Sequence, residues 1–99
     1  TLHVDSSNNR VGIGTTSPST LLHVAGGDAY ITLQGGASNS NAGILFKDSS
    51  GSQNSVILYD FDNDFLKISG TNDTERMRID SSGSLRYVAI LLMLLVLLT

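Results

Sequence analysis

A short unit in which a β-strand runs into a tight turn recurs along this chain, and it limits the possible folds more than any other feature. Residues 2–8 and 77–83 share one order: apolar, basic or histidine, β-branched, then Asp-Ser-Ser before Asn or Gly. Residues 22–27 repeat the strand half with Gly-Gly as the turn, and residues 46–51 repeat the turn half. Alternation gives each strand one apolar face, and Asp, Ser, Asn and Gly are residues that tight turns favour. The repeat therefore predicts short strands joined by turns.

Further strands are predicted between these units. The stretches concerned are residues 10–14, 21–24, 29–34, 43–47, 55–60, 65–69 and 75–79. Asp62-Asn63-Asp64 separates two of them and predicts a hairpin. No window of residues 1–84 has the 3.6-residue apolar period of a helix. We therefore expect an all-β fold of short antiparallel strands and hairpins, with turns rich in Gly, Ser and Asn.

Small polar residues are frequent in this chain, so the predicted strands have little apolar area to bury. The sequence holds 14 Ser and 10 Gly, and only 15% of its residues are charged. Open sheets of short strands also leave unpaired edges, and winding three chains together or stacking repeats along an axis removes those edges. We therefore expect a fibrous oligomer.

Charge and composition exclude several classes of function. The net charge is -3 with six Lys and Arg, so the basic surface that sequence-independent nucleic-acid binding requires is missing. Without cysteine the chain has neither a disulfide framework nor a thiolate metal site. Neither histidine lies in a pattern that predicts a Ser-His-Asp triad. We expect no enzyme activity, no catalytic, metal-binding or cofactor-binding residue, and no cofactor.

Residues 9–24 read Asn-Arg-Val-Gly-Ile-Gly-Thr-Thr-Ser-Pro-Ser-Thr-Leu-Leu-His-Val. This stretch resembles a repeat of bacteriophage tail fibre and tail spike proteins, and so do residues 74–83. The resemblance spans both ends of residues 1–84, and Gly-Ile-Gly-Thr-Thr-Ser-Pro is its most specific part. In that family such segments commonly lie in the shaft, ahead of a C-terminal intramolecular chaperone domain.

The resemblance implies a piece of a homotrimeric, β-rich structural protein of the virion that takes part in host attachment. Its implied partners are other tail proteins and a host surface glycan, which the exposed loop of residues 35–41 would contact. Two alternatives stay open. One is the stalk of an adhesin on a bacterial cell surface, and the other is a fragment of a polysaccharide-degrading spike.

Two groups of side chains suggest ligands but have simpler explanations. Asp60, Asp62 and Asp64 alternate as in a calcium loop, yet Phe65 stands where an EF-hand requires Gly, which favours a solvated hairpin turn. Aromatic rings can stack on a sugar, but core or inter-chain packing is the favoured role for the three candidates. These are Tyr30, Tyr59 and Phe61.

Other polar and glycine positions have structural interpretations. Gly12-Ile13-Gly14 lacks the third glycine of a dinucleotide fingerprint, so close backbone packing or turn geometry is expected there. His3 and His23 occupy matching repeat positions and are expected to point away from the apolar face, outward or into an interface. Arg76 and Arg78 are expected to lie on one solvated or cross-strand paired strand face.

The last residues have a different composition. Residues 85–98 hold seven of the 14 Leu, and residues 87–98 are 12 consecutive uncharged residues. A membrane span needs about 20, so none is expected. The expected boundary lies between a β-rich region, residues 1–84, and an apolar segment, residues 85–99. A reading-frame shift would explain the segment, since DNA for Asn-Thr-Ser-Pro-Asp-Ala-Thr read out of phase gives a similar Leu-rich run. The alternatives are a genuine buried strand or short helix and a membrane anchor.

Overall fold

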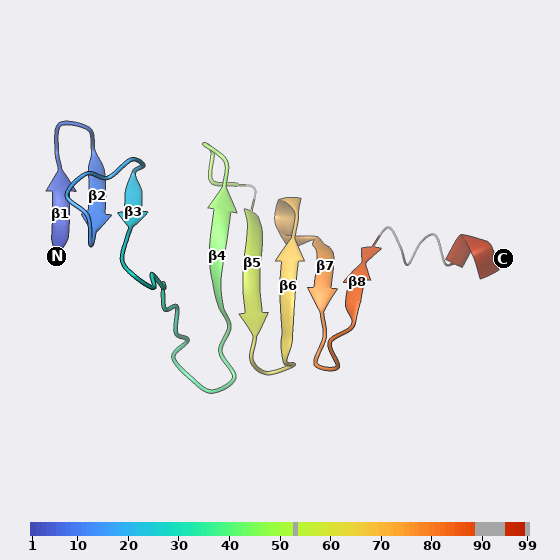
Figure 1. The fold of residues 1–99 in the computed structure, drawn as a ribbon. Helices are drawn as coiled ribbons and strands as arrows, with labels where there is room; N and C mark the ends of the chain where they lie inside the picture. Colours follow the sequence, from blue (N-terminus) through green and yellow to red (C-terminus); the bar gives the residue numbers. More distant parts are fainter. Residues whose placement is uncertain (53, 89–94, 99) are drawn as a thin grey trace. The chain divides into compact units, whose positions relative to one another are not determined.

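The computed structural model describes residues 1–52, 54–88 and 95–98, and its ordered elements are almost all β-strands (Figure 1). The chain divides into two units, Thr1–Thr32 and Leu33–Thr99, each with its own sheet. The expected division into residues 1–84 and residues 85–99 stays a prediction. Within the described residues, no helix is long and apolar enough to cross a membrane.

The sheet of the first unit has three strands in the order β1-β2-β3. Their bounds are Leu2–Asp5 for β1, Arg10–Ile13 for β2 and Leu22–Val24 for β3. β1 and β2 are antiparallel, but β2 and β3 are parallel, which differs from the antiparallel pairing that we expected. Residues 14–21 return the chain to the end of the sheet at which β2 begins, so β3 runs in the same direction as β2. Val11 N then donates to Leu21 O at 2.8 Å, and Ala25 N donates to Ile13 O at 2.9 Å.

The sheet of the second unit is a five-stranded antiparallel meander in chain order. Its strands are Ala42–Lys47 for β4, Asn54–Asp60 for β5, Phe65–Ser69 for β6, Glu75–Ile79 for β7 and Leu85–Tyr87 for β8. A short 3₁₀ helix, η1 (Thr71–Asp73), lies between β6 and β7. The predicted hairpin through Asp62-Asn63-Asp64 is confirmed, and the predicted bounds of β6 and β7 agree with the structure.

The turns form as the repeat predicted, because an aspartate side chain closes each one. Asp5 accepts a hydrogen bond from Asn8 N at 3.2 Å and another from Asn8 Nδ2 at 2.9 Å. Asp60 Oδ1 accepts from the backbone N–H of Asp62 and Asn63, at 3.0 Å each. Asp80 Oδ1 does the same for the backbone of the last turn, accepting from Ser82 N at 3.1 Å and Ser84 N at 2.9 Å. These bonds satisfy backbone donors that the turn takes out of the ladder.

One expectation about strands is wrong. Residues 29–34 alternate like a strand, yet no strand forms there, and Tyr30 and Ile31 are 85% and 64% exposed. Alternation alone does not form a strand when no neighbouring strand pairs with it. Strand β8 extends the sheet beyond Ser84, so the sheet includes the first three residues of the segment that we had separated. Val88 and residues 95–98 are helical, while residues 89–94 and 99 lie outside the described residues.

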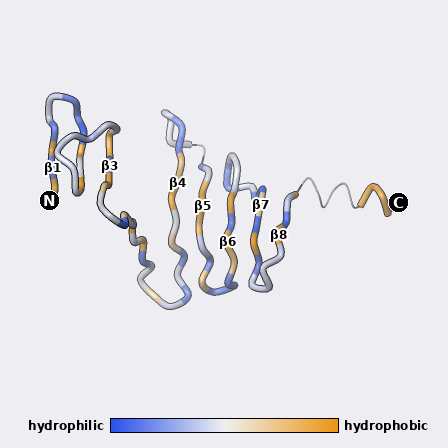
Figure 2. Tube along the Cα trace, in the orientation of Figure 1, coloured by the Kyte–Doolittle hydropathy of each residue, from blue (hydrophilic) through white to orange (hydrophobic). Residues whose placement is uncertain are grey.

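The interior of the protein is very small. In the second unit Val56 is buried at 7% exposure and Ser69 at 5%, and in the first unit Gly12 and Pro18 are buried. The Ser69 hydroxyl accepts a hydrogen bond from Val56 N at 3.1 Å, where the β5–β6 ladder stops. Apolar residues are spread along the strands of both sheets instead of being collected inside (Figure 2).

Candidate functional site

The strand register divides the side chains of the five-stranded sheet into two chemically different faces. Directly opposite residues of neighbouring strands lie on the same face of a sheet. Two rows that cross all five strands are apolar throughout. The first is Ile44, Ile57, Ile68, Met77 and Tyr87, and the second is Ala42, Tyr59, Leu66, Ile79 and Leu85.

We call the face that carries these two rows and Phe46 the apolar face of the second unit. None of its side chains is buried. Ile44 is 49% exposed, Phe46 is 51% exposed and Leu85 is 50% exposed. A continuous exposed apolar surface of this kind is typical of an interaction site.

The opposite face carries cations. Its central row runs through Gly43, Leu58, Lys67, Arg78 and Arg86. Each of the three cations has a carboxylate partner: Lys67 Nζ lies 3.3 Å from Asp73 Oδ1, Arg78 Nε 2.6 Å from Glu75 Oε1 and Arg86 Nη2 3.2 Å from Asp80 Oδ2. Salt bridges therefore neutralise this basic row.

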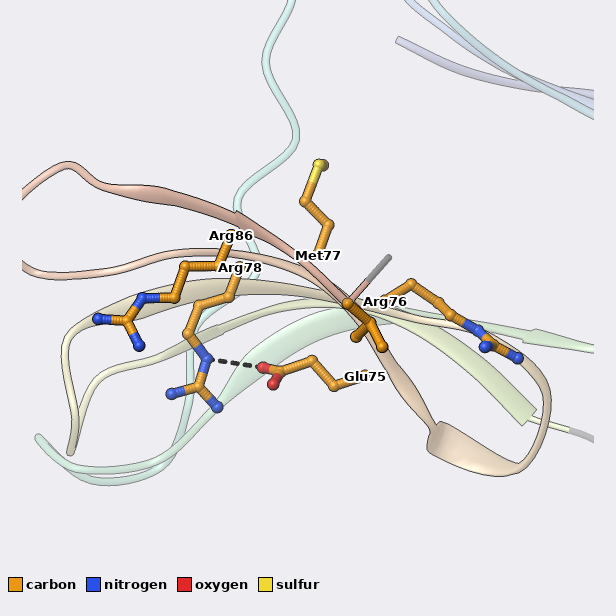
Figure 3. A pocket seen from close by; sticks show the side chains of 6 residues that line it. Glu75, Arg76, Met77, Arg78 and Arg86 are labelled. Atoms are coloured by element: carbon orange, nitrogen blue, oxygen red, sulfur yellow. Dashed lines mark hydrogen bonds and ion pairs between the residues drawn. The ribbon is translucent and has the colours of Figure 1, made fainter. Parts of the chain in front are cut away.

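A shallow depression of about 150 Å³ lies beside this row, over β7 and β8 (Figure 3). Glu75, Arg76, Arg78 and Arg86 line it, and Met77 points to the other side of the sheet. The guanidinium of Arg78 also lies over the ring of Phe65, 3.8 Å from its centroid. Arg78 is paired, but with Glu75 of its own strand and not with a carboxylate across the sheet as predicted. Arg76 has different surroundings, since its side chain lies over Gly70.

The three-stranded sheet of the first unit has the same division into two faces. Its apolar rows are Leu2, Ile13, Val24 and Val4, Val11, Leu22. We call them the apolar face of the first unit, on which Leu2 and Val4 are each 65% exposed. The other face carries the row His3, Gly12 and His23.

Residues 14–21 lie over that histidine face. A Cβ placed on Gly12 would come within 2.3 Å of Thr15 O, and Arg10 Nη1 donates to Pro18 O at 3.1 Å. His23 Nδ1 accepts a hydrogen bond from Ser19 N at 3.2 Å. The histidines thus point away from the apolar face, as predicted, but both are half-buried rather than outward.

The glycine prediction is confirmed. Gly12 has the close contact with Thr15 given above. Gly14 has a φ of +81°, and a Cβ there would lie 2.0 Å from Ala25 O. These glycines let the loop and the next strand approach the backbone of β2 closely.

The aspartates of the β5–β6 hairpin form the turn that the sequence favoured. Both Asp60 oxygens accept hydrogen bonds within the turn, and Asp64 accepts one from the Tyr59 hydroxyl. Across the part of the chain that the structure describes, no three His, Cys, Asp or Glu residues are grouped as metal ligands.

The aromatic candidates lie in different units. Tyr59 and Phe61 pack against each other with ring centroids 4.8 Å apart, and Phe61 is 52% exposed. Tyr30 belongs to the first unit. The loop of residues 35–41 is held by its own contacts, because Ser40 N donates to Ala37 O and Ala37 N donates to the Ser40 hydroxyl, both at 3.1 Å.

Comparisons with protein-family models, characterised proteins and solved structures give no significant match for this chain. The two apolar faces are the feature that sequence reasoning missed. The alternation within each strand pointed to them, but only the register aligns the apolar positions of neighbouring strands.

Proposed function

We propose that this chain is a piece of the shaft of a homotrimeric bacteriophage tail fibre or tail spike, and that it acts as a structural protein in host attachment. The observation that carries this proposal is the bare apolar face of each sheet. A protein built from such sheets needs other chains to complete its interior, as a fibre shaft does.

The energetics of burial support assembly. Burying a large apolar side chain stabilises a fold by about 1.5–3 kcal/mol, while ordering each residue costs roughly 1–2 kcal/mol. Few apolar side chains are buried among the described residues, and many large ones are more than a third exposed, so little of this ordering cost is offset within a single chain. Partner chains that cover the apolar faces would supply the missing burial.

The residue pattern supports the phage assignment over other assemblies. Residues 74–83, a stretch that resembles tail fibre sequences, form a strand and a turn that the Asp80 side chain closes. In this proposal the shaft is a stiff rod that exposes the loop of residues 35–41 for contact with a host surface glycan. Other tail proteins are its neighbours in the virion. We assign no catalytic step to the shaft, and the Asp60 carboxylate accepts hydrogen bonds within its turn.

Sedimentation equilibrium of the full chain tests the assembly. A mass near three times the 10.5 kDa of one chain is expected. A stable, folded monomer over the accessible concentration range would overturn the proposal. Sequencing the genes that flank the coding region tests the virion assignment: capsid and baseplate genes are expected, whereas genes for cell-surface anchoring would assign the chain to an adhesin.

A further inference from the structure

We propose that copies of this chain pack against one another through the apolar faces of both sheets, with the histidine face and the basic row directed outward. This inference rests on the proposed function in one respect, that the chain assembles with itself. It adds which surfaces meet and which stay in solvent.

One connecting segment in each unit provides the first argument, because it lies on the face opposite to the apolar one. In the first unit, residues 14–21 cover the histidine face, as the contacts of Gly12 and His23 show. A single chain that folded for itself would use such a loop to cover its aliphatic side chains. Here the loop covers polar ones and leaves the apolar face free.

In the second unit too, a connecting segment lies opposite to the apolar face, although it packs on the strand that carries the buried Val56. η1 packs against β5, and its Asp73 pairs with Lys67 on the basic row. The segment from β6 to β7 is therefore placed over the face of Lys67, opposite to Ile68 and Met77. Phe61 and Asp64 of the β5–β6 turn contact Tyr59 of the apolar face, while Ile44 and Leu85 stay about half exposed and open to close packing against another sheet.

Charge favours the apolar face as the contact surface. The two apolar rows of the second unit contain no charged residue, and the Asp64 carboxylate that contacts Tyr59 accepts a hydrogen bond from its hydroxyl. Packing through the opposite face would bury the ion pairs of Lys67, Arg78 and Arg86, and the desolvation of ion pairs opposes such burial.

The area of the apolar face fits a protein interface. Six of its side chains in the second unit are 38–51% exposed: Ile44, Phe46, Ile57, Ile79, Leu85 and Tyr87. If each large side chain offers up to roughly 200 Å², these six alone expose on the order of 500 Å², against about 800 Å² per partner in a standard interface. Their half-buried neighbours on the same face add to this.

A copy of the chain is the partner that fits best. The apolar faces need a partner wherever the chain is made, and other copies of the same chain are always made with it. The Leu-rich end of the chain is another apolar segment, and its residues 95–98 are 60–84% exposed. The experiments below therefore include it as an alternative occupant.

Ile44 and Leu45 provide a matched pair for the test. They are adjacent on β4, isomeric, 49% and 61% exposed, and on opposite faces of the sheet. The chain has no cysteine, so Ile44→Cys and Leu45→Cys each introduce one thiol. In the assembled protein we expect maleimide to label Ile44→Cys at least tenfold more slowly than Leu45→Cys. Equal labelling rates in an assembled protein would overturn the inference.

Sedimentation of Ile44→Asp and Leu45→Asp gives a second readout. We expect Ile44→Asp to raise the dissociation concentration at least tenfold and Leu45→Asp to leave it near the wild-type value. An assembled Ile44→Asp protein, or equal weakening by both variants, would refute the assigned face. A monomeric wild-type chain would instead refute the proposed function itself, so the two failures are distinguishable.

The double variant Leu97→Lys/Leu98→Lys addresses the Leu-rich end. We expect it to keep the wild-type mass and the protection of Ile44→Cys. Loss of that protection would show that the end of the chain, and not a second sheet, covers the apolar face.

Discussion

Glu75 and Arg78 are three residues apart on β7, yet their side chains meet on the same face, with Glu75 Oε1 2.6 Å from Arg78 Nε. Residues an odd number apart on a regular strand point to opposite faces. The register explains the exception, because Ser69 is opposite Glu75 and Ile68 is opposite Met77, which leaves Arg76 as an extra residue. This β-bulge lets β7 keep Met77 on the apolar face while it pairs its charges on the other.

We expect Glu75→Gln to lower stability only slightly. The two side chains of the ion pair are 35% and 36% exposed, so solvent screens the pair and its loss costs less than about 1 kcal/mol. Urea unfolding at one fixed chain concentration measures the change. The wild-type protein should lose more stability than the variant when salt is added, and a loss well above about 2 kcal/mol would contradict the screened pair.

Gly14→Ala is expected to destabilise the first unit by about 1–3 kcal/mol. Its φ of +81° disfavours a side chain, and the new Cβ would lie 2.0 Å from Ala25 O, a backbone atom that cannot turn aside. Gly26→Ala is the control, because no heavy atom lies within 4 Å of its Cβ position. The urea midpoint should fall for Gly14→Ala and stay within error for Gly26→Ala. Equal midpoints would show that the β2–β3 approach is looser than described.

Ser69→Ala is expected to cost about 1–3 kcal/mol although it removes a single oxygen. The hydroxyl is buried and accepts from Val56 N, so the substitution leaves a buried N–H without its partner. The exposed Ser49→Ala provides the control. Hydrogen exchange at Val56 N–H should accelerate in Ser69→Ala alone, and unchanged exchange would mean that another group satisfies this donor.

The turns and several strands were predictable because local chemistry determines them. An aspartate such as Asp60 or Asp80 bonds to backbone within four residues, so the sequence of the turn contains its own partners. β7 was predictable for the same reason, since the alternation of Met77 and Ile79 marks its apolar side.

Pairing between distant residues could not be predicted in this way. The parallel β2–β3 pair depends on the path of residues 14–21, and the missing strand at residues 29–34 depends on the lack of a neighbour. The row from Ile44 to Tyr87 depends on four registers at once, and the bulge at Arg76 changes one of them. Sequence alternation marks which residues are apolar but does not say which of them become neighbours.

The repeated aspartate turns should make stability depend on pH. The pKa of Asp5 is lowered from its ordinary value of 3.8, first by the hydrogen bond from the Asn8 side chain. The pKa of Asp60 is lowered mainly by Asn63, and that of Asp80 mainly by the Ser82 hydroxyl. A carboxyl whose pKa is lowered by folding stabilises the native state above its unfolded value, and that contribution is lost as the pH falls through the folded pKa.

The triple variant Asp5→Asn/Asp60→Asn/Asp80→Asn tests this linkage. Wild-type stability should decline as the pH falls below 3.8, because protonation then breaks the bonds that the three carboxylates accept. The variant should be less stable than wild type near pH 6 but lose less on acidification to about pH 3, since it has three fewer carboxylates to protonate. Urea midpoints at both pH values measure the difference. Asp28→Asn, at an exposed position outside these turns, should keep the wild-type pH dependence. A triple variant with an equally steep acid dependence would show that other carboxylates carry it.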